Sequence, residues 1–351
     1  MDIIFDLPHL YYLPQYLPVY EVLLRRGVRP QFVVSSHDDQ IPQVLAGLAL
    51  PYTLKAEPQL LDFYRSAEPD WIVFGNGYPD LAGLAKGTRT ALLYHGIGVK
   101  ACYYDSDLAE MDVRFVEGPA RASALRRLFP ASEFCEVGFA KLDPLLGAPT
   151  QRSRFDLAGA GLDPERPTVL YAPTFFPSSI ERLPLDWPRH CSEWNLLIKP
   201  HAFSLGKKRY RNQRRRFQAW DRWDHVYVAG PEHYSLLPFF GVSDLLISEA
   251  SSALFEFAAL DRPVVWCDFL HLRWSYRGPF QYRLNRRMDS TMEAWSDVGL
   301  HAARPEDLAS IVSQQLNRPE ECKDSRSRCT SDLIGNTDGL AAERIADRLL
   351  V

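Results

Sequence analysis

Residues 242–267 read VSDLLISEASSALFEFAALDRPVVWC, and the pattern within them indicates the fold class. The short apolar runs 244–248 and 263–267 are typical of buried parallel strands. Between them, apolar residues recur at helical spacing after Ser251 and Ser252, which stand where an N-cap is expected. A strand, a polar turn, a helix and a second strand form a βαβ unit, in which the strand ends and the first helical turn face the ligand crevice.

The two serines have two interpretations. The N–H groups at a helix start are unpaired and carry a partial positive charge, so paired hydroxyls at that point predict a receptor for a phosphate group. Serine is also a preferred cap of helices that bind nothing, so a capping role alone is the alternative. The stretch itself leaves both interpretations open.

The composition is that of an ordinary soluble globular protein of two domains. The chain has 351 residues, of which 46% are apolar and 24% charged, and its net charge of −4 does not favour nucleic acid as a partner. The six cysteines lack a CxxC pair or zinc-like spacing, which predicts reduced thiols in a cytoplasmic protein. We expect no cofactor, because neither a GxGxxG motif after the first strand nor an Asp-rich metal site is evident.

The same alternation of strands and helices extends along the whole chain. Before a polar linker at 148–166, about six parallel strands are predicted at 3–5, 29–34, 70–74, 89–94, 113–116 and 135–138. After it, strands at 168–172, 194–199 and 225–228 join the two of the opening stretch, and the tail from 305 is largely helical. The prediction is an α/β protein of two doubly wound Rossmann-like domains facing across a cleft, 1–149 and 150–351. Whether the last helix packs back on the first domain is left open.

His95 is the chemically most suggestive residue of the first domain. It follows the predicted strand 89–94 and precedes Gly96 and Gly98, which would let backbone approach a ligand closely. In such sheets, ligands bind at the carboxyl ends of the parallel strands. The alternative is a histidine satisfied within a turn.

Segment 206–223 departs from the rest in composition, because Lys and Arg residues are interleaved with aromatic residues. This pattern favours contact with an anionic membrane surface or with a polyphosphorylated acceptor. The alternative is a solvated helical face whose aromatics pack inward. Nucleic acid is a third interpretation, disfavoured by the acidic net charge. With neither a secretory signal nor about 18 consecutive apolar residues, any membrane contact is expected to be peripheral, at the inner face of the cell membrane.

Several motifs, in this order, resemble the CDP-glycerol glycerophosphotransferase family of teichoic-acid primases and polymerases. The residues that carry the resemblance are YHGIGVK (94–100), GFAKLD (138–143), LYAPT (170–174), IKPH (198–201), SDLLISEASSALFEFA (243–258) and Arg277-Gly278. The chain departs from the family pattern in four places. Ile97 replaces Thr, and Glu249-Ala250 replaces Asp-Tyr. Phe176 stands where Arg is common, which removes a possible phosphate ligand, and the segment after Arg277-Gly278 lacks the usual acidic residue, with Gln281 nearby.

The resemblance implies a GT-B fold and the transfer of glycerol phosphate from CDP-glycerol, or a similar nucleotide donor, to a hydroxyl of a lipid-linked glycan or polysaccharide, with CMP leaving. The first domain would bind the acceptor and the second the donor. A GT-B glycosyltransferase that uses a CMP-sugar or UDP-sugar, and a non-catalytic glycan-binding relative, are the alternatives.

The candidate site residues follow from this chemistry, in which the protein positions the groups and stabilises negative charge. His95 is the expected general base, because a histidine pKa of about 6.5 lies near neutrality. His201 is the second catalytic candidate, expected to act with the donor's pyrophosphate. The donor-binding candidates are Gly96, Thr174, Lys199, Ser251, Ser252, Glu256 and Arg277, with Lys100 as a weaker one. For Glu256 the alternative is a position that faces solvent.

Overall fold

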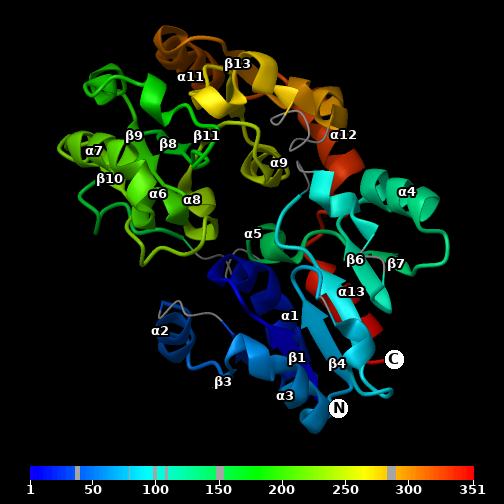
Figure 1. The fold of residues 1–351 in the computed structure, drawn as a ribbon. Coiled ribbons are helices and arrows are strands. Elements are labelled where there is room, and N and C mark those ends of the chain that lie inside the picture. The colour runs from blue at the N-terminus through cyan, green and yellow to red at the C-terminus, as the bar shows by residue number, and fades with distance from the viewer. Residues whose placement is uncertain (36–39, 79, 98–100, 107–109, 148–153, 283–289) are drawn as a thin grey trace. The chain divides into compact units, whose positions relative to one another are not determined.

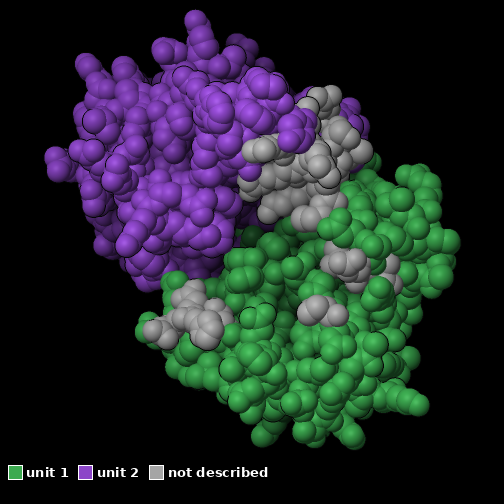
Figure 2. All heavy atoms as spheres, viewed as in Figure 1, with its two compact units in different colours: residues 1–96, 102–148, 331–351 green, residues 97–101, 149–330 purple. Residues whose placement is uncertain are grey.

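The computed structural model describes residues 1–35, 40–78, 80–97, 101–106, 110–147, 154–282 and 290–351. The chain forms two compact units, coloured separately in Figure 2. Unit 1 comprises residues 1–96, 102–148 and 331–351, and unit 2 comprises residues 97–101 and 149–330. Each unit is an α/β layer structure built on one parallel sheet (Figure 1).

Unit 1 contains a sheet of seven parallel strands in the order β3-β2-β1-β4-β5-β6-β7. The strands are β1 (Ile3–Asp6), β2 (Gln31–Val34), β3 (Tyr52–Leu54), β4 (Trp71–Phe74), β5 (Arg89–Leu93), β6 (Val113–Val116) and β7 (Phe134–Glu136). All residues of β1, β4 and β6 are buried, as expected for strands covered on both faces. The order of connections reverses between β1 and β4, and ligands of doubly wound sheets bind at such a switch point.

The helices of unit 1 are α1 (Leu13–Arg25), α2 (Gln40–Gly47), α3 (Leu60–Ala67), α4 (Pro119–Leu128), α5 (Asp143–Leu146) and α13 (Ala341–Leu349). Helix α1 follows β1 directly and buries one side against the sheet, with a proline in its first turn. It ends before Gly27, whose φ of +83° is a left-handed conformation that glycine adopts without strain.

Unit 2 contains a sheet of six parallel strands in the order β10-β9-β8-β11-β12-β13. The strands are β8 (Thr168–Tyr171), β9 (Asn195–Ile198), β10 (Val226–Val228), β11 (Leu245–Ser248), β12 (Val264–Cys267) and β13 (Leu300–Ala302). Here the switch point lies between β8 and β11. The helices are α6 (Ala202–Gly206), α7 (Arg211–Trp220), α8 (Leu237–Val242), α9 (Ser252–Ala258) and α11 (Leu308–Asn317), and α12 (Lys323–Leu333) runs from unit 2 into unit 1.

The C-terminal arm, residues 331–351, lies directly on the backbone of unit 1. A Cβ added at Gly118 would lie 2.6 Å from the carbonyl of Leu333, and one at Gly138 would lie 2.9 Å from the carbonyl oxygen of Asn336. Glycine is therefore required at both positions for the close approach of the arm.

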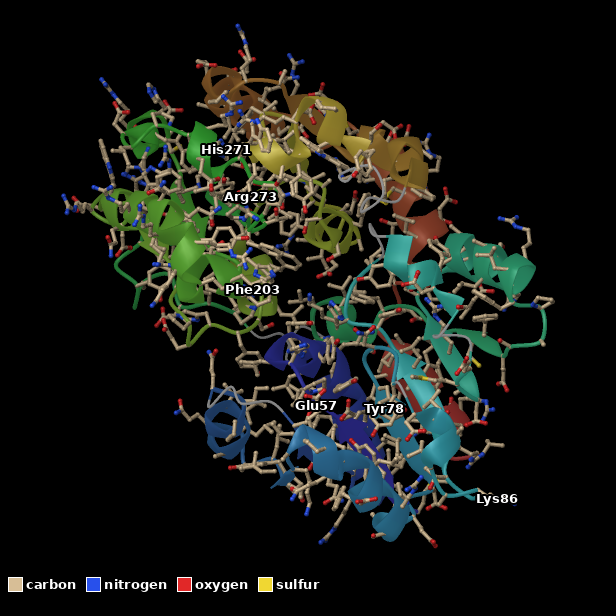
Figure 3. All side chains as sticks on the ribbon, viewed as in Figure 1. Glu57, Tyr78, Lys86, Phe203, His271 and Arg273 are labelled. Atoms are coloured by element: carbon tan, nitrogen blue, oxygen red, sulfur yellow. The ribbon has the colours of Figure 1, made fainter. Side chains whose placement is uncertain are left out.

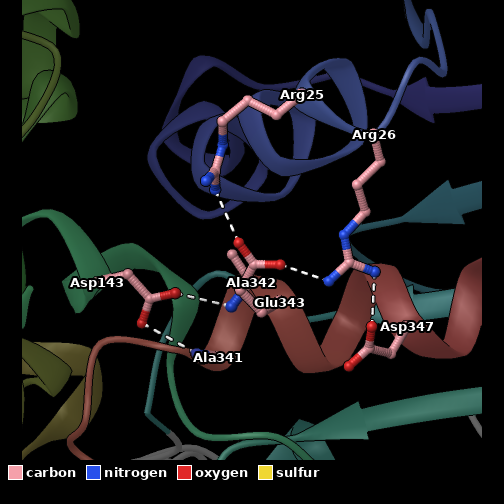
Figure 4. A network of polar contacts seen from close by, with 7 residues as sticks. All are labelled: Arg25, Arg26, Asp143, Ala341, Ala342, Glu343 and Asp347. Atoms are coloured by element: carbon pink, nitrogen blue, oxygen red, sulfur yellow. Dashed lines mark hydrogen bonds and ion pairs between the residues drawn. The ribbon is translucent and has the colours of Figure 1, made fainter.

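Helix α13 is fixed by polar contacts at both ends (Figure 4). The carboxylate of Asp143 accepts hydrogen bonds from the backbone N–H of Ala341, at 3.2 Å, and of Ala342, at 2.7 Å. Arg25 and Arg26 of α1 form ion pairs with Glu343, and Arg26 also pairs with Asp347. Asp143 thus acts as a cap for the start of α13, where unpaired N–H groups need an acceptor.

The basic segment 206–223 folds as the end of α6, a short turn and helix α7. Its aromatic side chains Tyr210, Phe217 and Trp220 are buried, so the prediction that the aromatics pack inward is confirmed. Arg214 and Arg216 donate to backbone carbonyls, whereas Lys207, Lys208, Arg209, Arg211, Arg215 and Arg222 are exposed. Contact of this face with an anionic membrane surface stays a prediction.

The sequence missed two elements and undercounted the strands. The sheet of unit 1 has seven strands rather than about six, and β13 adds a sixth to the five expected in unit 2. Strand β13 is three residues long with an exposed central residue, so it has no apolar run. Helix α12 is mostly polar, which hides its period.

Two features are absent from the described residues. They contain no helix long and apolar enough to cross a membrane. Within the same ranges, no group of three or more His, Cys, Asp or Glu residues is arranged to hold a metal ion.

Candidate functional site

His95 lies at the carboxyl edge of the unit 1 sheet, just after β5, and is surrounded by aromatic rings. Its ring centroid is 4.6 Å from that of Tyr11 and 4.8 Å from that of Tyr12, both from the turn that follows β1. The exposed ring of His9 stacks on Tyr11 at 5.0 Å. The residues after β1 and β5 therefore meet at the switch point of unit 1.

Gly75, directly after β4, completes this arrangement. A Cβ at Gly75 would lie 2.6 Å from the ring of Tyr12, so only glycine leaves room for that ring beside His95. Gly96, a predicted donor-binding residue, follows His95 in unit 1 and is buried. The predicted contact of Gly96 with the donor stays a prediction.

A buried carboxylate lies behind the tyrosines. Asp6, the last residue of β1, accepts a hydrogen bond from the hydroxyl of Tyr64 at 2.7 Å, and the hydroxyl of Tyr16 donates to its backbone carbonyl at 3.2 Å. Burial raises the pKa of Asp6 to about 6, although the Tyr64 hydrogen bond opposes the shift. Burial also raises the pKa of Tyr12 far above its usual range, so its hydroxyl stays protonated.

In unit 2 the switch point is organised by Glu249, which follows β11 and is 1% exposed. One carboxylate oxygen accepts from the backbone N–H of Thr174 at 2.7 Å. The other accepts from the N–H of Ser179 at 2.7 Å, from its hydroxyl at 2.5 Å and from the hydroxyl of Ser178 at 3.3 Å. The loop 173–179, which follows β8, is thereby tied to the end of β11.

The environment of Glu249 acts on its pKa in both directions. Burial raises the pKa above its usual range, and hydrogen bonds from Ser179 and Thr174 lower it. Every partner in this set donates to the carboxylate, so the contacts match an ionised group, which accepts only. The bond to Glu249 fixes the backbone of Thr174, and the hydroxyl of Thr174 donates to the carbonyl of Pro177 at 2.6 Å.

His201 lies after β9 and caps helix α6. Its Nδ1 accepts a hydrogen bond from the backbone N–H of Phe203 at 3.1 Å, which leaves Nε2 to carry the proton of the neutral ring. The ring also lies against those of Phe175 and Phe203, at 4.7 and 5.0 Å. Lys199 of the same connection donates to the carbonyl of Pro200 at 3.2 Å.

Ser251 and Ser252 begin helix α9, as predicted. The hydroxyl of Ser251 accepts from the N–H of Ala253 at 3.3 Å, so this serine does cap the helix. Glu256 on α9 is 1% exposed, so the alternative that it faces solvent is wrong. Arg277 is exposed and donates to the carbonyl of Leu272 at 2.6 Å. Lys100 lies outside the described residues.

The structure brings most of the predicted donor-binding residues to one edge of one sheet. Thr174, Lys199 and Ser251 follow β8, β9 and β11, three adjacent strands whose carboxyl ends meet there. Sequence reasoning missed Glu249, which fixes the loop at this edge. The signal for Glu249 was its place between a buried strand and the paired serines, where an acidic residue needs partners.

The comparisons with known proteins agree with this geometry. The model of a protein family described as CDP-Glycerol:Poly(glycerophosphate) glycerophosphotransferase matches residues 103–351. Because the match spans well over half of the chain, the chain belongs to this family, as the resemblance predicted. No curated protein matches the chain significantly.

Solved structures show the class of fold. A histidine variant of the wall teichoic acid polymerase TagF, soaked with CDPG, is 14% identical over 99% of this chain and 88% of that chain, with a TM-score of 0.67. MnaA from S. aureus with UDP is 13% identical over 99% and 95%, with a TM-score of 0.66. UDP-GlcNAc 2-epimerase from Neisseria meningitidis is 13% identical over 100% of both chains, with a TM-score of 0.62. These likenesses confirm the predicted GT-B type of fold.

The pKa of Asp6 predicts how stability changes with pH. The pKa is about 6 in the folded protein and 3.8 for an aspartate in an unfolded chain. The folded state therefore binds this proton more tightly than the unfolded chain does. Its contribution to the free energy of unfolding is fully present below pH 4. It falls by up to about 3 kcal/mol as the pH rises to about 6.

The substitution Asp6→Asn removes this titration and keeps an acceptor for Tyr64. We expect the free energy of unfolding of the variant, measured in urea from pH 4 to 8, to rise relative to wild type up to about pH 6 and then level off. Asp62→Asn, at an 84% exposed side chain, is the control. A constant difference between wild type and Asp6→Asn across this range would contradict the prediction.

Glu249 offers a second test. In Glu249→Gln the amide oxygen replaces one carboxylate oxygen, but the NH2 group faces a donor, such as the N–H of Thr174, and cannot accept. We expect unit 2 to lose about 1–3 kcal/mol of stability, the cost of an unmade buried hydrogen bond. Urea unfolding measures the loss, and hydrogen exchange should show faster exchange in 173–179. Glu193→Gln, at an exposed position, should change neither; unaltered exchange in Glu249→Gln would refute the role of the carboxylate.

Proposed function

We propose that the protein transfers glycerol phosphate, or a related polyol phosphate, from a CDP-activated donor to a hydroxyl of a cell-surface glycan or lipid-linked acceptor, and releases CMP. The observation that carries the proposal is the family match, which covers residues 103–351 and so includes all the predicted site residues from Thr174 to Arg277. On this reading the enzyme is a transferase of the EC 2.7.8 type.

The donor is assigned to unit 2. The edge that holds Thr174, Lys199 and Ser251 lies at a topological switch point, where doubly wound sheets bind nucleotides. His201 supports this assignment, because the Nε2–H of its neutral ring is a hydrogen-bond donor of the kind that binds a phosphate oxygen. The fold also suits such a ligand, since one similar TagF structure was soaked with CDPG and MnaA was solved with UDP.

The reaction is a phosphoryl transfer. The acceptor oxygen forms a bond to the phosphorus that carries glycerol, and the bond from that phosphorus to the bridging oxygen breaks, so CMP leaves with the electron pair. The proton of the acceptor hydroxyl goes to His95. Backbone N–H groups, the serine hydroxyls, His201 and Lys199 stabilise the charge that spreads over the phosphate oxygens.

A nucleotide sugar is the second candidate donor. The likeness to MnaA with UDP and to UDP-GlcNAc 2-epimerase favours it, since these folds accept uridine diphosphate ligands. The purified protein should therefore be offered CDP-glycerol, CDP-ribitol, a CMP-sugar and UDP-GlcNAc, each with a panel of lipid-linked and glycan acceptors. We expect CMP release with CDP-glycerol or CDP-ribitol only. Release of CMP from the CMP-sugar, or of UDP from UDP-GlcNAc, would favour the second candidate, and release of no nucleotide with any pair would favour a non-catalytic relative.

The role of His95 is tested by His95→Ala. If this side chain removes the proton, turnover at saturating donor should fall roughly 100-fold or more, the usual contribution of a general base, while donor affinity changes little. His190→Ala, at an exposed histidine of unit 2, is the matched control and should keep full activity. Unchanged turnover in His95→Ala would remove this histidine from the mechanism.

A further inference from the structure

Arg273 has a contact pattern that the proposed roles do not use. It lies on the connection that follows β12 and is half-buried, between His271 and Phe203 in the view of Figure 3. Its guanidinium carbon is 4.1 Å from the ring centroid of Phe176 and 5.3 Å from that of Tyr210. Its Nη2 also donates to the hydroxyl of Tyr210 at 2.7 Å.

These contacts fix the guanidinium without occupying most of its donors. A guanidinium has five N–H donors in one plane, and stacking on an aromatic ring uses the face of that plane. Among the described residues, the bond to Tyr210 is the one hydrogen bond that Arg273 makes, and no carboxylate within those ranges pairs with it. By contrast, the half-buried Arg262 and Arg216 each donate to two backbone carbonyls.

Arg273 lies among the groups already assigned to the donor. The ring of Phe175 contacts His201 at 4.7 Å and Tyr210 at 5.9 Å, and Tyr210 holds Arg273. The connections after β8, β9 and β12 therefore converge through these rings at the carboxyl edge of the sheet. A cation fixed at that edge, with in-plane donors left over, is suited to a ligand with several oxygen atoms on one anionic group.

We infer that Arg273 binds the pyrophosphate of the nucleotide donor. The inference rests on the proposed function and adds to it a residue that donates two parallel N–H bonds to phosphate oxygens. Tyr210 is a positioning residue, because its hydroxyl sets the plane of the guanidinium and does not itself contact the donor. The ring of Phe176, 4.1 Å from the guanidinium carbon, adds a cation–π contact that holds the side chain in place.

The experiment measures affinity for two probes, CDP-glycerol and inorganic pyrophosphate, by calorimetry. We expect Arg273→Met to weaken CDP-glycerol binding roughly 10- to 100-fold, as for loss of charge-assisted hydrogen bonds. Arg273→Lys keeps the charge but not the planar fork, so its loss should be smaller. Tyr210→Phe keeps the ring but removes the hydrogen bond that orients the guanidinium, and should weaken binding about 2- to 5-fold. Arg304→Met is the matched control, at an exposed arginine paired with Asp307, and should bind both probes as wild type does.

The two probes separate failure of this inference from failure of the proposed function. Thermal unfolding verifies that both Arg273 variants are folded. If they bind CDP-glycerol as well as wild type does, the inference is overturned and the proposed function stands. If wild type binds pyrophosphate but not CDP-glycerol, the donor assignment fails. Loss of pyrophosphate binding in Arg273→Met would then still support the phosphate site. Binding of neither probe to wild type would overturn both.

Discussion

The second unit depends on the hydrogen bonds that satisfy one buried carboxylate. Glu249 is 1% exposed, and a carboxylate in that position costs several kcal/mol unless donors replace the water it loses. Those donors come from Thr174, Ser178 and Ser179. The loop after β8 therefore has few conformations open to it, because any that withdraws its N–H groups leaves the carboxylate unsatisfied. The hydroxyl of Tyr171, bonded to that of Ser179 at 2.7 Å, extends the network into the core.

The first unit builds its switch point by packing rather than by charge. The ring of Tyr12 lies over Gly75 and against His95, so the histidine is oriented by the shape of its surroundings. Behind it, the Asp6 carboxyl accepts a hydrogen bond from the Tyr64 hydroxyl, and burial raises its pKa to about 6. Such packing gives the ring a fixed direction, a useful property for a general base.

The sequence predicted the fold well because the strands are buried on both faces. Runs such as 71–74 and 245–247 have no polar interruption that could hide them. Strand β13 lacks that signal because it is three residues long with an exposed central residue, and helix α12 lacks it because its residues are mostly polar. For the site, the sequence predicted the residues that belong to single motifs, but not the contacts between residues of different motifs. Glu249 and Ser179 are 70 positions apart and Arg273 and Tyr210 are 63 apart, so no spacing rule brings either pair together.

Charge balance connects Glu249 with Arg273. An ionised carboxylate two residues before Ser251 would repel a phosphate held at the start of α9, and the repulsion is strong where water is excluded. The donors on Glu249 spread its charge into the loop and reduce that repulsion. Arg273, on the connection after the neighbouring strand β12, adds the opposite charge and is paired with no carboxylate of the described residues. A half-buried cation is costly when no counter-ion compensates its charge, and a bound pyrophosphate would remove that cost. The lack of a carboxylate partner for Arg273 among the described residues therefore favours an anionic ligand.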